Sequence, residues 1–356
     1  MRYKLIVSHP GKYVKEAIEA LGMSHHEFAV RTGMLDKTVS TLINGESNIT
    51  YDIACKLAYF FDTEDVLWIN LQNAYNKYLY ELEQEKTLEE EWKIVSYFER
   101  DFINALYDEK LNFRNRDDII EKLRRTFKVN SLLNLTSTDM FSFYRTSIEK
   151  ELDVKQIVLR NAWITYAITK SSDQSCKEYN ETDLKKCISI IKGLINLPLK
   201  DALCKLKEIL NDVGVKILFL PYLKNSNISG FTKWLPNENA VLIVVNDHGK
   251  TLDKFWFNLF HELGHALHIK KRYITINNAD IKSEEEQADV FANNELINFS
   301  KYNQFVAARD YSISSIKRFA INNDIPIYIV IGRLQKDGII EWNMFNEYKE
   351  KLSFNK

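Results

Sequence analysis

Glycine and proline are scarce in this chain of 356 residues, with 11 of the first and 5 of the second. These two residues supply many of the backbone conformations that tight turns need. A chain with so few of them has few tight turns, and lysine and glutamate are abundant. The composition therefore favours a mainly helical fold, and the length is enough for two or three domains.

Closely spaced cysteine pairs are also missing. The four cysteines, Cys55, Cys176, Cys187 and Cys204, contain no Cys-x-x-Cys pair and lie in helix-like contexts. Paired cysteines at short spacing are typical of zinc and redox sites, and disulfides are typical of secreted proteins. We therefore expect these cysteines to be reduced core residues of a cytosolic protein, and not metal ligands.

Neither a strong net charge nor a long apolar run is present. The net charge of −1 gives no overall attraction to nucleic acid or membrane. No run approaches the roughly 18 apolar residues of a membrane span, and the start is interrupted too early by His9-Pro10 to be a signal peptide. We expect a cytoplasmic protein that does not enter the membrane.

The stretch from Phe257 to His268 carries the strongest chemical pattern. Its apolar residues recur at three- and four-residue steps, as in an amphipathic helix. His261 and His265 are four apart and lie on one face of such a helix, so both imidazoles can reach one tetrahedral zinc ion. Glu262 would lie beside the metal and accept a proton from water. The alternative is a surface helix with two solvated histidines.

A zinc hydrolase also needs a third protein ligand and an open fourth position. Glu285 and Asp289 follow about 20 residues after the histidines and are four apart, on one face of a second helix. Glu285 could bind the metal, and Asp289 could accept a hydrogen bond from a ligating histidine and fix its tautomer. The alternative is a solvated helix start, with Ser283 and Glu286 as a capping box.

These two motifs together resemble zinc peptidases. An HExxH at 261–265 followed by ExxAD at 285–289 is similar to the thermolysin-type pattern of glutamate-ligated enzymes. With Phe291-Ala292, the string resembles the ImmA/IrrE metallopeptidase family. The choice of Glu285 over Glu286 as the ligand depends on the spacing to Asp289 and on this family pattern.

The ImmA/IrrE resemblance runs over about 213–342. Ser229-Gly230, Asn246 and the segment 327–342 also match the family at their positions. It implies a zincin-like α+β domain that binds Zn²⁺ through His261, His265 and Glu285. It also implies a bacterial or phage repressor protein as the substrate.

Three stretches before the HExxH motif predict a small sheet. The segments 213–220, 228–234 and 240–246 are rich in β-branched and aromatic residues, and 236–239 has the composition of a turn. An edge strand of such a sheet could hold an extended peptide by strand addition. Beyond the ExxAD helix, 313–319 and 325–334 predict two further helices, and Tyr273 could polarise a carbonyl.

The N-terminal residues, about 1–78, predict a bundle of five short helices. Ser24 is placed to begin the second helix, Gly33 to break it, and 36–43 to form the third. Short helix, glycine turn and short helix is the geometry of a helix-turn-helix, whose second helix enters the major groove. The residues expected to face DNA are Asp36, Lys37, Thr38, Ser40 and Thr41 towards bases, and Ser24 and His25 towards phosphate.

This segment resembles the Cro/repressor-like domains, and more narrowly the HigA-type antitoxins. The resemblance depends on His9-Pro10-Gly11, Ser24-x-x-Glu27-Phe28-Ala29, Thr38-Val39-Ser40, Asn44-Gly45 and the stretch 68–75. It implies a homodimer on an operator in double-stranded DNA, and a toxin partner. Residues 1–75 carry 7 Lys plus Arg against 9 Asp plus Glu, a net of −2, so electrostatic attraction to DNA is weak. The alternative is a helical bundle that binds only protein.

We therefore expect a multidomain, mainly α protein: a helix-turn-helix domain at 1–78, a helical middle region at 79–210 and a zinc metallopeptidase domain at 211–356. Residues 80–91 are expected to form a solvated helical connector. As an enzyme, the chain would cleave a repressor-type protein or itself. The rival interpretation is a repressor or antitoxin whose peptidase fold binds a partner or signal without turnover.

Overall fold

The computed structural model describes residues 7–138, 140, 152–272, 278–352 and 354. The chain divides into two compact units, Met1–Trp92 and Lys93–Lys356. Both are mainly helical, and the second contains a small sheet, as the sequence predicted. The finer division at residues 78 and 210 stays a prediction. Among the described residues, no helix has the length and apolar character needed to cross a membrane.

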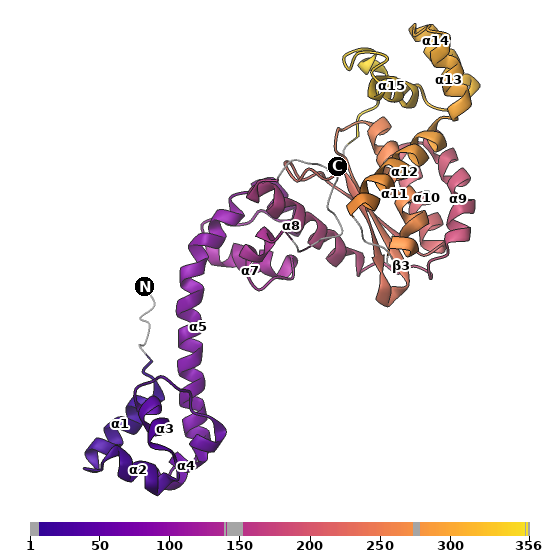
Figure 1. Cartoon of the computed structure of the whole chain (residues 1–356). Helices are drawn as coiled ribbons and strands as arrows, with labels where there is room; N and C mark the ends of the chain where they lie inside the picture. The colour runs from indigo at the N-terminus through magenta and orange to yellow at the C-terminus, as the bar shows by residue number, and fades with distance from the viewer. Residues whose placement is uncertain (1–6, 139, 141–151, 273–277, 353, 355–356) are drawn as a thin grey trace. The chain divides into compact units, whose positions relative to one another are not determined.

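The five predicted helices are present (Figure 1): α1 Pro10–Ala20, α2 His25–Thr32, α3 Asp36–Ile43, α4 Tyr51–Phe61 and α5 Asp65–Val95. The fifth is not short: its 31 residues include the predicted connector and end three residues beyond the first unit. The Ser24 hydroxyl accepts a hydrogen bond from the Glu27 amide at 3.1 Å and begins α2, and Gly33 ends it with φ of 65°. Phe28, Val39 and Leu42 are fully buried between the helices. The helix-turn-helix geometry of α2 and α3 therefore has its own apolar core.

One further detail of this unit differs from expectation. The connector 80–91 is helical as predicted, but Glu91 is fully buried. It is one turn from the buried Val95 on the same face of α5, so this end of the connector is not solvated.

The second unit begins with helices that lead to the sheet: α6 Arg100–Tyr107, α7 Arg116–Thr126, the 3-10 helix η1 Leu132–Thr136, α8 Val154–Ser171, α9 Glu181–Gly193 and α10 Leu199–Asp212. The sequence pattern did not predict α9. All four cysteines are free, as expected, but none is fully buried, and Cys204 is exposed. Their expected place in the core was therefore wrong.

The sheet consists of β1 Val215–Leu220, β2 Gly230–Leu235 and β3 Ala240–Asn246, in the order β1-β3-β2. The central strand β3 is parallel to β1 and antiparallel to β2. Every residue of β3 is buried, which matches its unbroken apolar sequence. The predicted strands are confirmed, and among the described strands β2 pairs with β3.

The remaining helices are α11 Leu252–Arg272, α12 Asn278–Leu296, α13 Phe299–Ala307, α14 Ile313–Asn322 and α15 Ile327–Lys336. The sequence pattern did not predict α13. Because α12 begins at Asn278, the acidic run at 283–286 lies inside the helix, and the alternative of a helix start with Ser283 and Glu286 as a capping box is wrong. The Ser283 hydroxyl instead accepts a hydrogen bond from the Gln287 amide at 3.1 Å.

Helices α11 and α12 approach each other closely at Gly264. A Cβ atom on Gly264 would lie 3.1 Å from the Phe291 ring and 3.3 Å from the Ala288 Cα. Ala288 is buried at this contact. Small residues on both helices therefore allow the backbones to come together, and the HExxH face of α11 meets the ExxAD face of α12.

We predict that Gly264→Val destabilises the protein by about 1–3 kcal/mol, because the added methyl groups overpack this contact. The free energy of unfolding in urea measures the effect. Gly193→Ala is the matched control, since a Cβ there meets no atom within 4 Å, and it should be neutral or slightly stabilising. Equal stability of Gly264→Val and the natural protein would contradict the packing argument.

Candidate metal centre and helix-turn-helix surface

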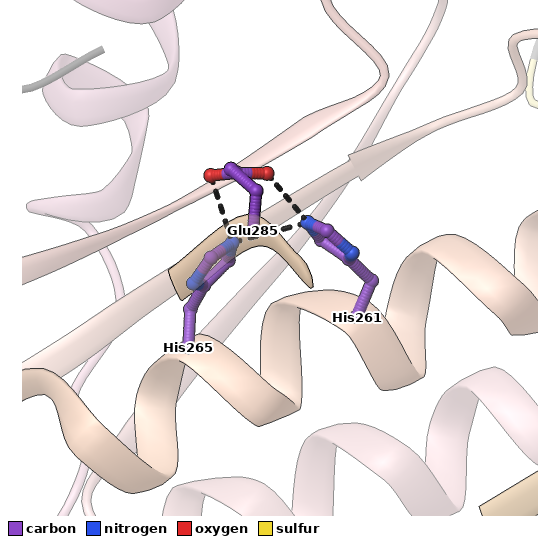
Figure 2. A group of neighbouring side chains, drawn as sticks. All are labelled: His261, His265 and Glu285. Atoms are coloured by element: carbon purple, nitrogen blue, oxygen red, sulfur yellow. Dashed lines mark hydrogen bonds and ion pairs between the residues drawn. The ribbon is translucent and has the colours of Figure 1, made fainter. Parts of the chain in front are cut away.

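Three side chains of the two motifs converge at one point (Figure 2). His261 and His265 project from successive turns of α11, and Glu285 reaches them from α12. The two Nε2 atoms are 3.0 Å apart. The Glu285 carboxylate places one oxygen 3.2 Å from His261 Nε2 and the other 3.2 Å from His265 Nε2. Glu286 is exposed and belongs to another face of the helix.

This arrangement fits a zinc ion. The nearest ligand atoms of the three residues all lie within 4.8 Å of one another. Two ligand atoms bound about 2.0–2.1 Å from a tetrahedral zinc ion are separated by about 3.3 Å. The observed separations are close to this value, and two imidazoles with one carboxylate are a donor set that suits zinc.

Asp289 lies behind His261 on the side away from the three ligand atoms. Its Oδ1 is 2.9 Å from His261 Nδ1. A carboxylate at this nitrogen keeps the proton on Nδ1 and so leaves the Nε2 lone pair directed at the other ligands. The other carboxylate oxygen, Oδ2, accepts a hydrogen bond from Lys336 Nζ at 3.3 Å.

Hydrogen bonds within the cluster shift the pKa values of two of its side chains. Burial disfavours the charged imidazole, but hydrogen bonds with Asp289 and Glu285 outweigh it and raise the pKa of His261 to about 10. Burial likewise opposes the ionised Glu285, but hydrogen bonds with both histidines hold its pKa well below the usual range. The hydrogen bonds between His261 and Glu285 therefore favour the charged forms of both side chains.

Glu262, the predicted general base, directly follows His261 on α11. Its side chain is only 6% exposed, and the hydroxyl of Thr232 on β2 lies 2.7 Å from its Oε2. A Cβ atom on Gly230 would lie 3.1 Å from Glu262 Oε1 and 2.7 Å from the Val244 carbonyl oxygen. The start of β2 therefore accommodates the Glu262 carboxylate, because residue 230 has no side chain.

The loop before β2 is fixed by a buried amide. Asn246 donates from Nδ2 to the Ile228 carbonyl at 2.8 Å and accepts a hydrogen bond from the His248 amide at 2.9 Å. The pattern residues Ser229-Gly230 and Asn246 are thus explained by the position of β2 beside Glu262. Tyr273, a candidate for polarising a carbonyl, lies outside the described residues.

The residues predicted to face DNA lie on the surface of α2 and α3. Five of the seven are exposed, whereas Thr38 and Thr41 are half-buried; the exposed ones are Ser24, His25, Asp36, Lys37 and Ser40. The Thr41 hydroxyl donates to the Thr38 carbonyl at 3.1 Å. Asp36 is not free, because both its oxygens lie 3.0 Å from His26 Nδ1 on α2.

The sequence reasoning missed two side chains of the metal centre. Thr232 lies two residues after Gly230 on a strand, hence on the same face, and this alternation was a usable signal. Lys336 is separated from Asp289 by 47 residues and a further helix pair. No spacing rule connects Lys336 to the motif.

Comparison with known proteins agrees with both parts. Residues 210–320 match the model of the IrrE N-terminal-like domain, family Peptidase_M78. An uncharacterised HTH-type transcriptional regulator of Escherichia coli K12, YddM, is 32% identical over 80 residues, which are 22% of this chain and 81% of that protein. An uncharacterised HTH-type regulator of Haemophilus influenzae is 33% identical over 76 residues, or 21% and 69%.

Among solved structures, an addiction module antidote protein of the HigA family from Coxiella burnetii matches with 32% identity. The match covers 24% of this chain and 95% of that one, with a TM-score of 0.23. The regulator matches concern the N-terminal part of the chain, and the peptidase-family match concerns its C-terminal part. The chain therefore belongs to the HTH-type transcriptional regulators and carries, at residues 210–320, a domain of the IrrE-like peptidase family.

Proposed function

We propose that this protein is a DNA-binding regulator that carries a zinc-dependent metalloendopeptidase. The observation that supports it best is the convergence of His261, His265 and Glu285, with the carboxylate of Glu262 buried beside them. A module that only bound a partner would not need a buried carboxylate next to three metal ligands. Asp289 orients His261 from behind.

When bound, a zinc ion would supply Lewis acidity, lowering the pKa of a water molecule and polarising a peptide carbonyl. Glu262 accepts the proton of the attacking water and transfers it to the leaving amine. The Thr232 hydroxyl holds Oε2 of Glu262 at 2.7 Å, so Oε1 is the oxygen assigned to proton transfer. The glycine at 230 leaves the space that this oxygen occupies.

The substrate we propose is an extended segment of a protein. β2 pairs with β3, and Gly230 at its start lies against the Glu262 carboxylate. An extended peptide that bound beside the start of β2 would bring a backbone carbonyl towards Glu262 and the ligand cluster. A repressor-type protein, including the helix-turn-helix of this chain or of a second copy in a homodimer, is the substrate class we favour.

Glu262→Gln tests the catalytic role. The full chain is incubated with zinc, alone and with purified repressors encoded near its gene, and products are read by mass spectrometry. We expect discrete cleavage by the natural protein, and a rate at least about 100-fold lower for Glu262→Gln at unchanged zinc content, because general-base catalysis contributes about 10²–10⁴-fold.

Glu286→Gln is the matched control, since it removes an exposed charge from the neighbouring motif and should leave cleavage unchanged. If the natural protein binds zinc but cleaves neither itself nor any of the repressors, the peptidase proposal is wrong, and the domain is a binding module without turnover. In that case the peptidase fold would sense a partner or signal for the regulator.

For the first unit, we propose that α3 reads an operator in double-stranded DNA. Lys37 is the exposed cation near the start of this helix, where major-groove contacts are made. The pairing of Asp36 with His26 keeps the neighbouring carboxylate turned towards α2. Lys37 is therefore the residue from which we expect the largest contribution to DNA affinity. A toxin that binds this unit, as in antitoxin systems, is a further proposed partner.

Selection from genomic DNA fragments tests this. We expect the natural protein to enrich a small set of fragments, and Lys37→Ala to weaken binding to them about tenfold at constant salt. Lys77→Ala on α5 removes the same charge from another exposed site and should change the affinity little. Failure to enrich any fragment, or equal loss in both variants, would favour a bundle that binds protein only.

A further inference from the structure

A lysine from a distant helix contacts the back of the metal centre. Lys336 is the last residue of α15, and its Nζ lies 3.3 Å from Asp289 Oδ2. The same ammonium group lies 3.7 Å from the centre of the Phe257 ring, within cation–π range. One cation therefore touches both helices that carry the ligands, α12 through Asp289 and α11 through Phe257.

These contacts form a short series that ends at a ligand. Lys336 binds Oδ2 of Asp289, and Oδ1 of the same carboxylate lies 2.9 Å from His261 Nδ1. Phe257 is one helical turn before His261, and their ring centroids are 6.3 Å apart. The ammonium group is thus held by the ring at one side and by the carboxylate at the other.

The ability of His261 to bind a metal ion through Nε2 depends on the orientation of Asp289. His261 can offer the Nε2 lone pair only when Nδ1 carries the proton, and Oδ1 of Asp289 is the acceptor for that proton. Asp289 is partly exposed, so water competes for its oxygens. A cation fixed on Oδ2 limits the rotation of the carboxylate.

We propose that Lys336 is a positioning residue of the metal centre, acting on His261 through Asp289. This inference depends on the proposed metal site and adds to it a residue that contacts Asp289 and no metal ligand. A partly exposed ion pair contributes little to folding stability, so the effect of Lys336 should appear in metal affinity and ligand geometry and not in the unfolding midpoint.

A double-mutant cycle on the full chain tests the proposal. Zinc affinity is measured by competition with a chromophoric chelator for the natural protein, Lys336→Met, Asp289→Asn and the double variant. We expect Asp289→Asn to weaken zinc binding about 10- to 100-fold, as loss of a partner of a ligating histidine does. Lys336→Met, which keeps the aliphatic stem, should weaken it about three- to tenfold, and the double variant should match Asp289→Asn alone.

Two further measurements and two further variants separate positioning from folding. The absorption spectrum of the cobalt(II)-loaded protein should shift in Lys336→Met, because it reports ligand geometry. Lys336→Arg, which keeps the charge, should restore both affinity and spectrum. Lys301→Met, an exposed lysine on α13, should change neither. All variants without metal should unfold at the temperature of the natural protein.

The outcomes distinguish failure of the proposed metal site from failure of the proposed role of Lys336. If the natural protein binds no zinc, the proposed metalloenzyme itself fails. If the natural protein binds zinc but Lys336→Met binds it equally well, the role of Lys336 is refuted. An undiminished effect of Lys336→Met in the Asp289→Asn background would also refute it, since Lys336 would then act by another route.

Discussion

The close packing of α11 against α12 is the constraint on which the proposed metal centre depends. Gly264 and Ala288 let the two backbones approach within van der Waals distance. A larger residue at either place would push apart the helix that carries both imidazoles and the helix that carries the carboxylates. The geometry of the site therefore depends on a residue without a side chain, Gly264, between His261 and His265.

Charge is concentrated where this packing brings the motifs together. Two imidazoles, Glu285 and Asp289 share a partly buried space, and their hydrogen bonds raise the pKa of His261 and lower those of both carboxyl groups against the effect of burial. Such perturbed groups are typical of functional sites. Clusters of this kind are stabilised by a cation, and either a proton or a metal ion can provide the positive charge.

Local patterns in the sequence were sufficient to predict the parts that follow a helical or strand period. Residues four apart lie on the same face of a helix. The spacing of His261 and His265, and of Glu285 and Asp289, therefore predicted which face of each helix carries the site. The apolar runs located all three strands. The start of α12 was missed because the acidic run that resembles a helix start lies inside a longer helix. Lys336 was missed because only the tertiary fold brings α15 to Asp289.

The central claim is that α11 and α12 together bind one metal ion, and the most direct test is the zinc content of the purified protein. Inductively coupled plasma mass spectrometry is applied to the natural chain, Glu285→Ala and Glu286→Ala after exposure to zinc and removal of the excess. We predict close to one zinc per chain for the natural protein and Glu286→Ala, and a large loss for Glu285→Ala, because only Glu285 contacts both histidines. A natural chain without zinc, or a loss caused by Glu286→Ala and not by Glu285→Ala, would contradict the account.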